Sequence, residues 1–345
     1  MKICNILYTM IFALIFTSCE NDIPFNVKNN PPKLVVNAIF DADSPENFIF
    51  LSKTGKEDID SIYNATINIY VNDVLKDQLT EPVLQEYGYN THWYYNPYKN
   101  KKYKTELRFN PGDKVKIEVF ADNNKYHAWA EDIIPKPLEI DYIDTMTYIK
   151  DFNQHIRLKT TFTDPSNENN FYRLALVQNN TSYIKTNDYG YITTAYEETL
   201  YMDTREDFVL NDGKVYTEND ILPQTENRFS LFNDSRLNGA YTMTTSFYRP
   251  VHYYHTPAGE EGFVERVSID FKIHLISITE MQYYYLKAMS IISSDSYDEY
   301  LSTPVSFPSN VEGGVGFVGF SAGTHKTFSI PDIILRDDSW YGHPY

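Results

Sequence analysis

The feature that most constrains the fold is a repeated alternation of apolar and polar residues in short runs. Clear examples are residues 65–71, 114–120 and 156–163, and the first two are followed by the turn residues Asn72-Asp73 and Asp122-Asn123-Asn124. A period of two places successive side chains on opposite faces, so such runs favour half-buried β-strands over helices. The abundance of Thr, Asn and Tyr also favours strands and turns. We therefore expect a mostly β protein.

The strand pattern changes character along the chain, which predicts two parts. Residues 33–137 contain short strands at the spacing of an immunoglobulin-like or transthyretin-like sandwich, and Ile133-Ile134-Pro135-Lys136-Pro137 marks its exit. Residues 138–345 carry longer alternating runs and form a larger β-rich domain. One helix is expected near 279–292, where Thr279 and Gln282 have the spacing of a capping box. A length of 345 residues also fits one large all-β unit.

The N-terminus resembles a bacterial lipoprotein signal. Residues 1–18 combine Lys2 with an apolar run over residues 6–16 that is too short to span a bilayer. Phe16-Thr17-Ser18-Cys19 resembles a lipobox, in which the cysteine is acylated with chains such as palmitate and becomes the new N-terminus. A conventional signal peptide with an incidental cysteine is the alternative.

Cleavage before Cys19 would also remove Cys4, the only other cysteine. The remaining cysteine has no intramolecular partner, which agrees with its use as a lipid attachment site. Several acyl chains anchor a protein firmly, whereas one chain holds it only marginally. We expect residues 19–32 to form a polar tether between the outer-membrane lipid and the folded body.

The charged residues indicate which partners and which location to expect. The formal net charge is −17, and an acidic surface repels the phosphate backbone, so nucleic acid is not an expected partner. Glu20 and Asp22, directly after the cysteine, resemble the acidic export signal that places lipoproteins of Bacteroidota on the outer face of the outer membrane. A tether that is merely polar is the alternative to cell-surface display.

An aromatic segment over residues 87–98 is the strongest candidate contact surface. Tyr and Trp beside Asn and His provide stacking faces and hydrogen-bonding groups suited to a glycan, a peptide or a protein partner. The alternative is a solvated hairpin whose rings pack on one another. The candidate contact residues are Tyr89, Trp93, Tyr94, Tyr95 and Tyr98, and the triplets starting at Asp60 and Asp144 resemble O-glycosylation acceptors at Ser61 and Thr145.

No motif in the sequence predicts catalysis, a metal or a cofactor. Gly319-Phe320-Ser321-Ala322-Gly323 matches the letters of a hydrolase nucleophile elbow, but the following residues alternate like a strand instead of starting a helix. His252 and His255 lie between two prolines, where their spacing has no fixed geometry for metal binding. We expect a protein that is not an enzyme, with no catalytic residues and no metal site.

Several segments in order resemble a Bacteroidota lipoprotein family of unknown function. They are the lipobox cysteine, Lys33-Leu34-Val35-Val36-Asn37, Pro111-Gly112-Asp113, Phe232-Asn233-Asp234 with Asn238-Gly239, residues 278–286, and the closing run 309–319 with its Asn-x-x-Gly-Gly-x-Gly pattern. The resemblance implies a two-part β protein usually encoded beside a TonB-dependent receptor, with no established catalytic residues. The expected function is a surface lipoprotein that assists such a receptor or recognises its substrate. A free-standing glycan-binding or adhesive lipoprotein is the alternative, and a structural or assembly subunit is a third.

Overall fold

The chain divides into two units, Met1–Pro32 and Lys33–Tyr345, and every described helix and strand belongs to the second. The computed structural model describes residues 31–55, 62–83, 101–150, 153–165, 168–186, 190–214, 226–248, 251–252, 262–294, 297–298, 302–330 and 335–336. The second unit starts at Lys33, directly after the predicted tether. The boundary expected at residues 137 and 138 stays a prediction, because this division does not cut the chain there.

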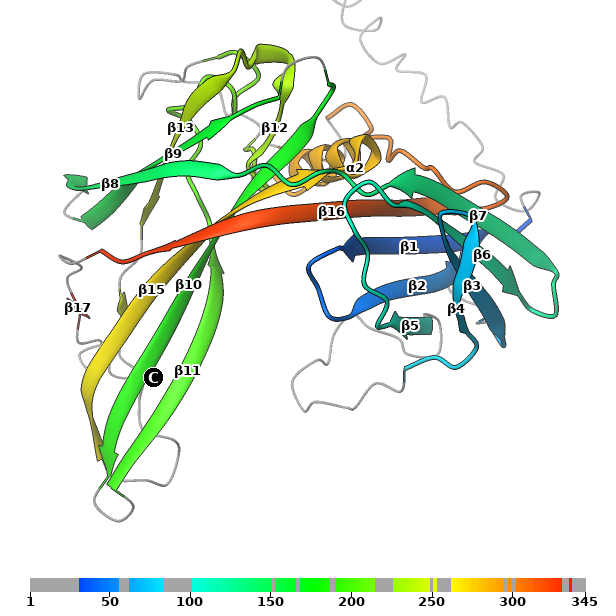
Figure 1. Cartoon of the computed structure of the whole chain (residues 1–345), viewed down its shortest axis with the longest axis horizontal. Coiled ribbons are helices and arrows are strands. Elements are labelled where there is room, and N and C mark those ends of the chain that lie inside the picture. The colour runs from blue at the N-terminus through cyan, green and yellow to red at the C-terminus, as the bar shows by residue number, and fades with distance from the viewer. Residues whose placement is uncertain are drawn as a thin grey trace, which may run out of the picture. The chain divides into compact units, whose positions relative to one another are not determined.

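The largest sheet brings the first strand of this unit beside strands from its C-terminal half (Figure 1). β1 and β16 pair in parallel, while the other neighbours are antiparallel. The order across the sheet is β11 (Gly190–Leu200), β10 (Phe171–Thr186), β15 (Gly262–Ile278), β16 (Val315–Phe328), β1 (Leu34–Asp41), β2 (Asn47–Lys53) and β5 (Lys101–Thr105), with β12 (Leu231–Asn233) also pairing with β10.

A second sheet faces one end of the first across a shared core. Its order is β4 (Val74–Leu79), β3 (Ala65–Val71), β6 (Lys114–Ala121) and β7 (Tyr126–Ile133). Every second side chain of β3 and β6 is buried, which is the alternation seen in the sequence. One hydrophobic cluster contains Ile67 and Val119 from this sheet together with Phe40 of β1 and Val318 of β16. The C-terminal strand β16 therefore completes the core of the N-terminal part.

A second core lies over the other end of the large sheet. The three-stranded sheet β13 (Ala240–Tyr248), β9 (Asn153–Thr163) and β8 (Ile140–Lys150) contributes Met243 and Leu158, which share a cluster with Leu174 of β10 and Leu275 of β15. Helix α2 (Glu280–Ile292) follows β15. The remaining short elements are the 3-10 helix η3 (Asp234–Arg236) and the pair β14 (Val251–His252) and β17 (Leu335–Arg336).

The structure confirms a mostly β fold with a helix in the C-terminal half, and the helix begins one residue after Thr279. The expected capping-box bond is wrong, because the Thr279 hydroxyl accepts from the Phe320 N–H at 3.3 Å and makes no cap bond to the helix. Asp212-Gly213 is a hairpin signal that predicts a strand over residues 208–210, and this prediction is wrong, since these residues form turns. The immunoglobulin-like or transthyretin-like detail of the N-terminal sandwich stays a prediction.

Candidate functional site

A cleft of about 690 Å³ opens between the end of β7 and the start of α2. One wall is residues 131–136, the end of β7 and the segment after it, and the opposite wall is the β15–α2 junction, residues 277–281, with Tyr284. Gly112, residues 168–171 and Asn310 complete the lining. We call this the β7–α2 cleft. It is built by segments that lie far apart in the sequence.

The β7 wall presents an unpaired strand edge. Trp129 exchanges two backbone hydrogen bonds with Glu312, at 3.0 and 2.8 Å, on the side of β7 opposite to β6. Because outward-pointing backbone groups recur every second residue, those of Glu131 and Ile133 point to the same side. The Ile133 N–H bonds to the Asp132 carboxylate at 2.8 Å, but no hydrogen bond within the described residues reaches the outward backbone groups of Glu131. The cleft thus begins where the chain at Glu312 leaves this edge.

Among the described residues, two polar side chains that line the cleft have no hydrogen-bond partner. Ser277 is only 3% exposed, and neither its hydroxyl nor the Asn170 amide nitrogen makes a hydrogen bond to another described residue. Buried polar groups are normally paired, because an unpaired one costs about 1–3 kcal/mol. The first N–H groups of α2 also lack a side-chain cap. The cleft therefore offers several donors to a bound molecule with acceptor groups.

Apolar surface is exposed beside these donors. The Ile133 side chain is 57% exposed on the β7 wall and Tyr284 is 47% exposed on the helix. The Tyr284 ring lies 6.1 Å from the ring of Phe171, another lining residue. A ligand that covers these rings and alkyl groups removes apolar surface from water, which favours binding.

Carboxylates dominate the charge of the cleft. Glu131 pairs with Lys114 at 3.2 Å, and Lys136, the one lysine among the described residues of the lining, pairs with Glu168 at 3.7 Å. Asp132 and Glu280 have no cationic partner within the described part of the chain. Burial raises the pKa of the Asp132 carboxyl, the charge of Glu280 raises it further, and the Ile133 N–H opposes both. A cation between these two carboxylates would relieve their repulsion.

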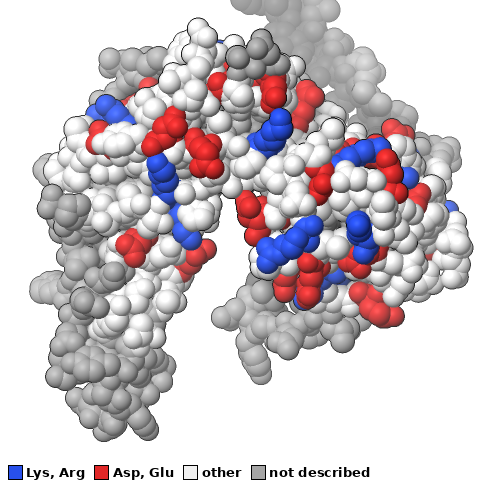
Figure 2. Space-filling model, in the orientation of Figure 1, with Lys and Arg blue, Asp and Glu red and all other residues white. Residues whose placement is uncertain are grey.

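On the face drawn in Figure 2, Lys and Arg side chains are interspersed with Asp and Glu. The excess of acidic residues is therefore not gathered there in a single patch. Local charge in the cleft, rather than a field of one sign over that face, would decide which ligand fits it.

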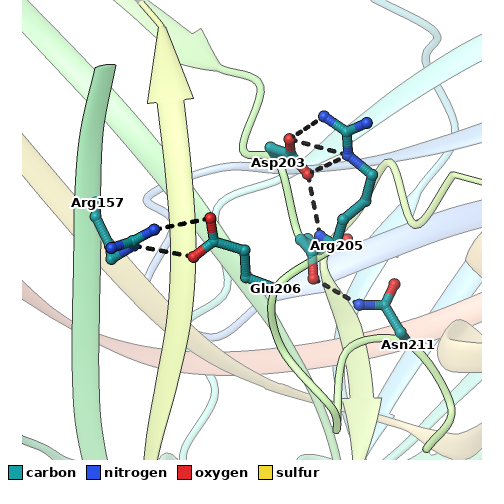
Figure 3. A network of polar contacts seen from close by, with 6 residues as sticks. Arg157, Asp203, Arg205, Glu206 and Asn211 are labelled. Carbon is teal, nitrogen blue, oxygen red and sulfur yellow. Dashed lines mark hydrogen bonds and ion pairs between the residues drawn. The ribbon is translucent and has the colours of Figure 1, made fainter. Parts of the chain in front are cut away.

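A second group of polar residues holds the loop 203–211 against the sheet of β9 and β13 (Figure 3). Arg157 of β9 donates to both carboxylate oxygens of Glu206 at 2.9 Å. Arg205 donates to Asp203 at 2.9 and 3.0 Å, and Asn211 donates to a backbone carbonyl of the loop at 2.7 Å. Burial alone would raise the pKa of Asp203, but the bonds from Arg205 hold it below its ordinary value. Because these charges are paired with one another, we assign the network a role in positioning the loop.

The structure places few of the residues singled out in the sequence. Thr145 lies in β8, half-buried and opposite Leu158 of β9, and its glycosylation stays a prediction. The other predicted contact and modification residues fall outside the described residues: Cys19, Ser61, Tyr89, Trp93, Tyr94, Tyr95 and Tyr98.

The serine of the hydrolase-like motif is a core residue. Ser321 is 4% exposed in the middle of β16, and its hydroxyl donates to the Phe40 carbonyl at 3.2 Å. The strand continues to Phe328, so no strand-to-helix elbow is present. His252 lies in β14, and His255 is outside the described residues. Among the residues that the structure describes, no group of three metal-binding side chains is assembled.

Sequence reasoning missed the β7–α2 cleft. It assigned Ile133-Ile134-Pro135-Lys136-Pro137 only as a domain exit and Thr279 only as a helix start. The available signal was the pair Glu131-Asp132 near the end of a strand, followed by prolines at 135 and 137, because proline stops strand pairing and leaves polar backbone exposed. Nothing in the sequence showed that α2 lies opposite.

Comparison with known proteins identifies the family. The model of a domain of unknown function, DUF4249, matches residues 20–327. The chain belongs to this family. No curated protein matches the chain. Within the described residues, no helix is both long and apolar enough to cross a bilayer.

Proposed function

We propose that this DUF4249 protein is a lipoprotein of the bacterial outer membrane, anchored through acylated Cys19 and displayed on the cell surface of a member of the Bacteroidota. There it acts as an accessory or substrate-recognition partner of a TonB-dependent receptor. The observation that carries the proposal is an agreement of boundaries. The family match starts at residue 20, directly after Cys19, and the compact unit starts at Lys33, directly after the polar segment.

The physical role of the anchor is confinement. A body tethered to the membrane surface meets a receptor in the same membrane at a high effective concentration, so weak contacts suffice for association. The β7–α2 cleft supports a recognition role, because it combines exposed apolar side chains with hydrogen-bonding groups that no described residue pairs with. Catalysis is not part of the proposal.

Affinity purification tests the partnership. A tagged full chain, expressed in its own host and purified from detergent-solubilised membranes, should bring down a TonB-dependent receptor in stoichiometric amount. The matched control is Cys19→Ala, which should lose the acyl mass, leave the membrane fraction and recover less receptor. If the wild-type chain recovers no such receptor, the accessory role is wrong.

Protease added to intact cells tests display on the surface. We expect digestion of the wild-type chain while a periplasmic control protein stays intact. Complete protection until the outer membrane is permeabilised would place the protein on the periplasmic side.

A free-standing glycan-binding or adhesive lipoprotein is the second candidate. A row of rings across the third sheet favours it: His155 lies 5.5 Å from Tyr148 and 5.3 Å from Tyr248, and Tyr248 is 42% exposed. Binding on a glycan array that is lost on Trp93→Ala with Tyr94→Ala, or on Tyr248→Ala, would support this candidate. An array without signal would contradict it.

A further inference from the structure

We infer that the β7–α2 cleft binds an extended, basic segment of a partner polypeptide, which adds to the free edge of β7 as a further strand. This inference deepens the proposed function and rests on it only for the partner's identity. It assigns a binding site and a ligand chemistry to residues that neither the family match nor the sequence motifs mark.

The first step of the argument is the edge itself. The backbone pair between Trp129 and Glu312 shows that a chain already lies along β7 at this point, in antiparallel direction. One step further along the strand, the outward N–H and C=O of Glu131 have no partner in the described chain. An unpaired strand edge is a template for another strand, and strand addition is a common mode of peptide recognition.

The second step is the opposite wall. Ser277 is 3% exposed and has no hydrogen-bond partner among the described residues, and it lines the cleft together with the uncapped start of α2 at Glu280 and Met281. A strand on the β7 edge would turn its second row of backbone groups toward this wall. Its carbonyl oxygens match the donors there, which a purely apolar ligand would leave unpaired.

The third step is side-chain chemistry. Side chains of an added strand alternate between two faces. Ile133, Tyr284 and Phe171 provide apolar contacts, whereas Asp132 and Glu280 are carboxylates without a cationic partner in the described residues. Alternating apolar and Lys or Arg residues fit both sets, while an acidic peptide would meet two like charges. Charge complementarity thus selects a basic segment.

Three fluorescently labelled hexapeptides test the inference by anisotropy with the full chain in detergent micelles. They alternate valine with lysine, with serine or with glutamate. The valine–lysine peptide should bind tightest, and Glu280→Gln should weaken it by about 3- to 10-fold, in keeping with loss of one charged contact. Glu197→Gln, which removes an exposed carboxylate on β11, is the matched control for net charge and should have little effect. Equal binding of all three peptides, or an equal effect of both variants, would overturn the inference.

A backbone variant separates strand addition from surface attraction. Glu131→Pro removes an outward N–H that β6 does not use, so an edge strand should tolerate it. Glu131→Ala removes the same side chain and keeps the N–H. Relative to Glu131→Ala, we expect Glu131→Pro to weaken the valine–lysine peptide by about 5- to 30-fold, because a main-chain hydrogen bond is lost. Equal affinities for two variants with wild-type circular dichroism would exclude strand addition. If the Glu131→Pro variant does not fold, the comparison of Glu280→Gln with Glu197→Gln decides the test.

The same variants keep this inference distinct from the proposed function. If the receptor co-purifies with wild type and equally with Glu131→Pro, the receptor partnership stands and the cleft is not its site. If the valine–lysine peptide binds as expected while no receptor co-purifies, the strand-addition site stands and the proposed function is wrong.

Discussion

Replacing Gly316 by alanine tests the junction between β1 and β16. Gly316 has φ +120°, a backbone conformation that residues other than glycine rarely adopt. A Cβ atom at this position would lie 2.2 Å from the Val36 carbonyl oxygen and 3.0 Å from the Asn37 side-chain oxygen. Val36 is the parallel strand partner of Gly316, so neither backbone can move without disturbing the sheet.

The expected loss of stability has two contributions. Backbone strain at such a conformation costs about 1–3 kcal/mol. Relieving an overpacked contact in a well-packed region costs about 1–3 kcal/mol more. We therefore expect Gly316→Ala to lower the free energy of unfolding by roughly 2–6 kcal/mol, with a fall in Tm on the order of 10 °C.

Gly112→Ala is the matched control, because Gly112 has φ +90° but no atom lies within 4 Å of the place that an added Cβ would occupy. It should show backbone strain alone, about 1–2 kcal/mol. Urea unfolding followed by circular dichroism, with a thermal melt, measures both variants. The reasoning is refuted if Gly316→Ala is no less stable than Gly112→Ala.

Four further outcomes are expected from urea and thermal unfolding. Lys53→Met should lower the free energy of unfolding by about 3 kcal/mol, because it removes the ion-pair partner that lies 2.9 Å from the Asp122 carboxylate. The side chains of this pair are only 7% and 11% exposed, so the carboxylate would stay largely buried without a partner. Burial would raise the pKa of Asp122, but bonds from Lys53 and neighbouring N–H groups hold the pKa below its ordinary value. The stability that Asp122 contributes is therefore full above the pKa of the unfolded state and lost as pH falls through the pKa of the folded state, so Asp122→Asn should flatten the acid side of the stability curve. Ser277→Ala should raise the free energy of unfolding by up to about 1–3 kcal/mol, because it removes a buried hydroxyl that has no partner among the described residues, and a loss of stability would mean that the hydroxyl is paired. Asn310→Ala should cost about 1–3 kcal/mol, because its amide bonds both the N–H and the carbonyl of Val318, at 2.9 and 2.7 Å; a neutral result would contradict that bonding.

Local patterns predicted the strands well because burial on one face of a sheet is written into alternate residues. The runs 65–71 and 114–120 became β3 and β6 with almost the expected bounds. Thr279 marked the start of α2 although its hydroxyl bonds elsewhere, because the extended conformation before a helix does not depend on the side-chain bond. Asp212-Gly213 was misleading, because the same residues that close a hairpin also form an isolated turn.

The candidate cleft could not be predicted, because it depends on which distant segments become neighbours. Periodicity shows which face of β7 is buried, but not that Glu312 covers only part of its edge. The glycines at 313 and 316 are visible in the sequence as part of a motif, but the contacts that require glycine at these positions come from distant segments of the chain. A side chain at Gly313 would meet the His127 carbonyl, and one at Gly316 would meet that of Val36.

The pairing of β1 with β16 also determines when the protein can finish folding. The N–H of Phe317 bonds to Asn37, 280 positions away in the sequence. As the chain emerges from a ribosome or a membrane translocon, Val318 and Phe320, which complete the first core, arrive near the end. Contacts of such long sequence separation form slowly. Until β16 has been made, the core that the N-terminal strands share with it stays incomplete. During that time we expect these strands to need chaperones and to be sensitive to proteases.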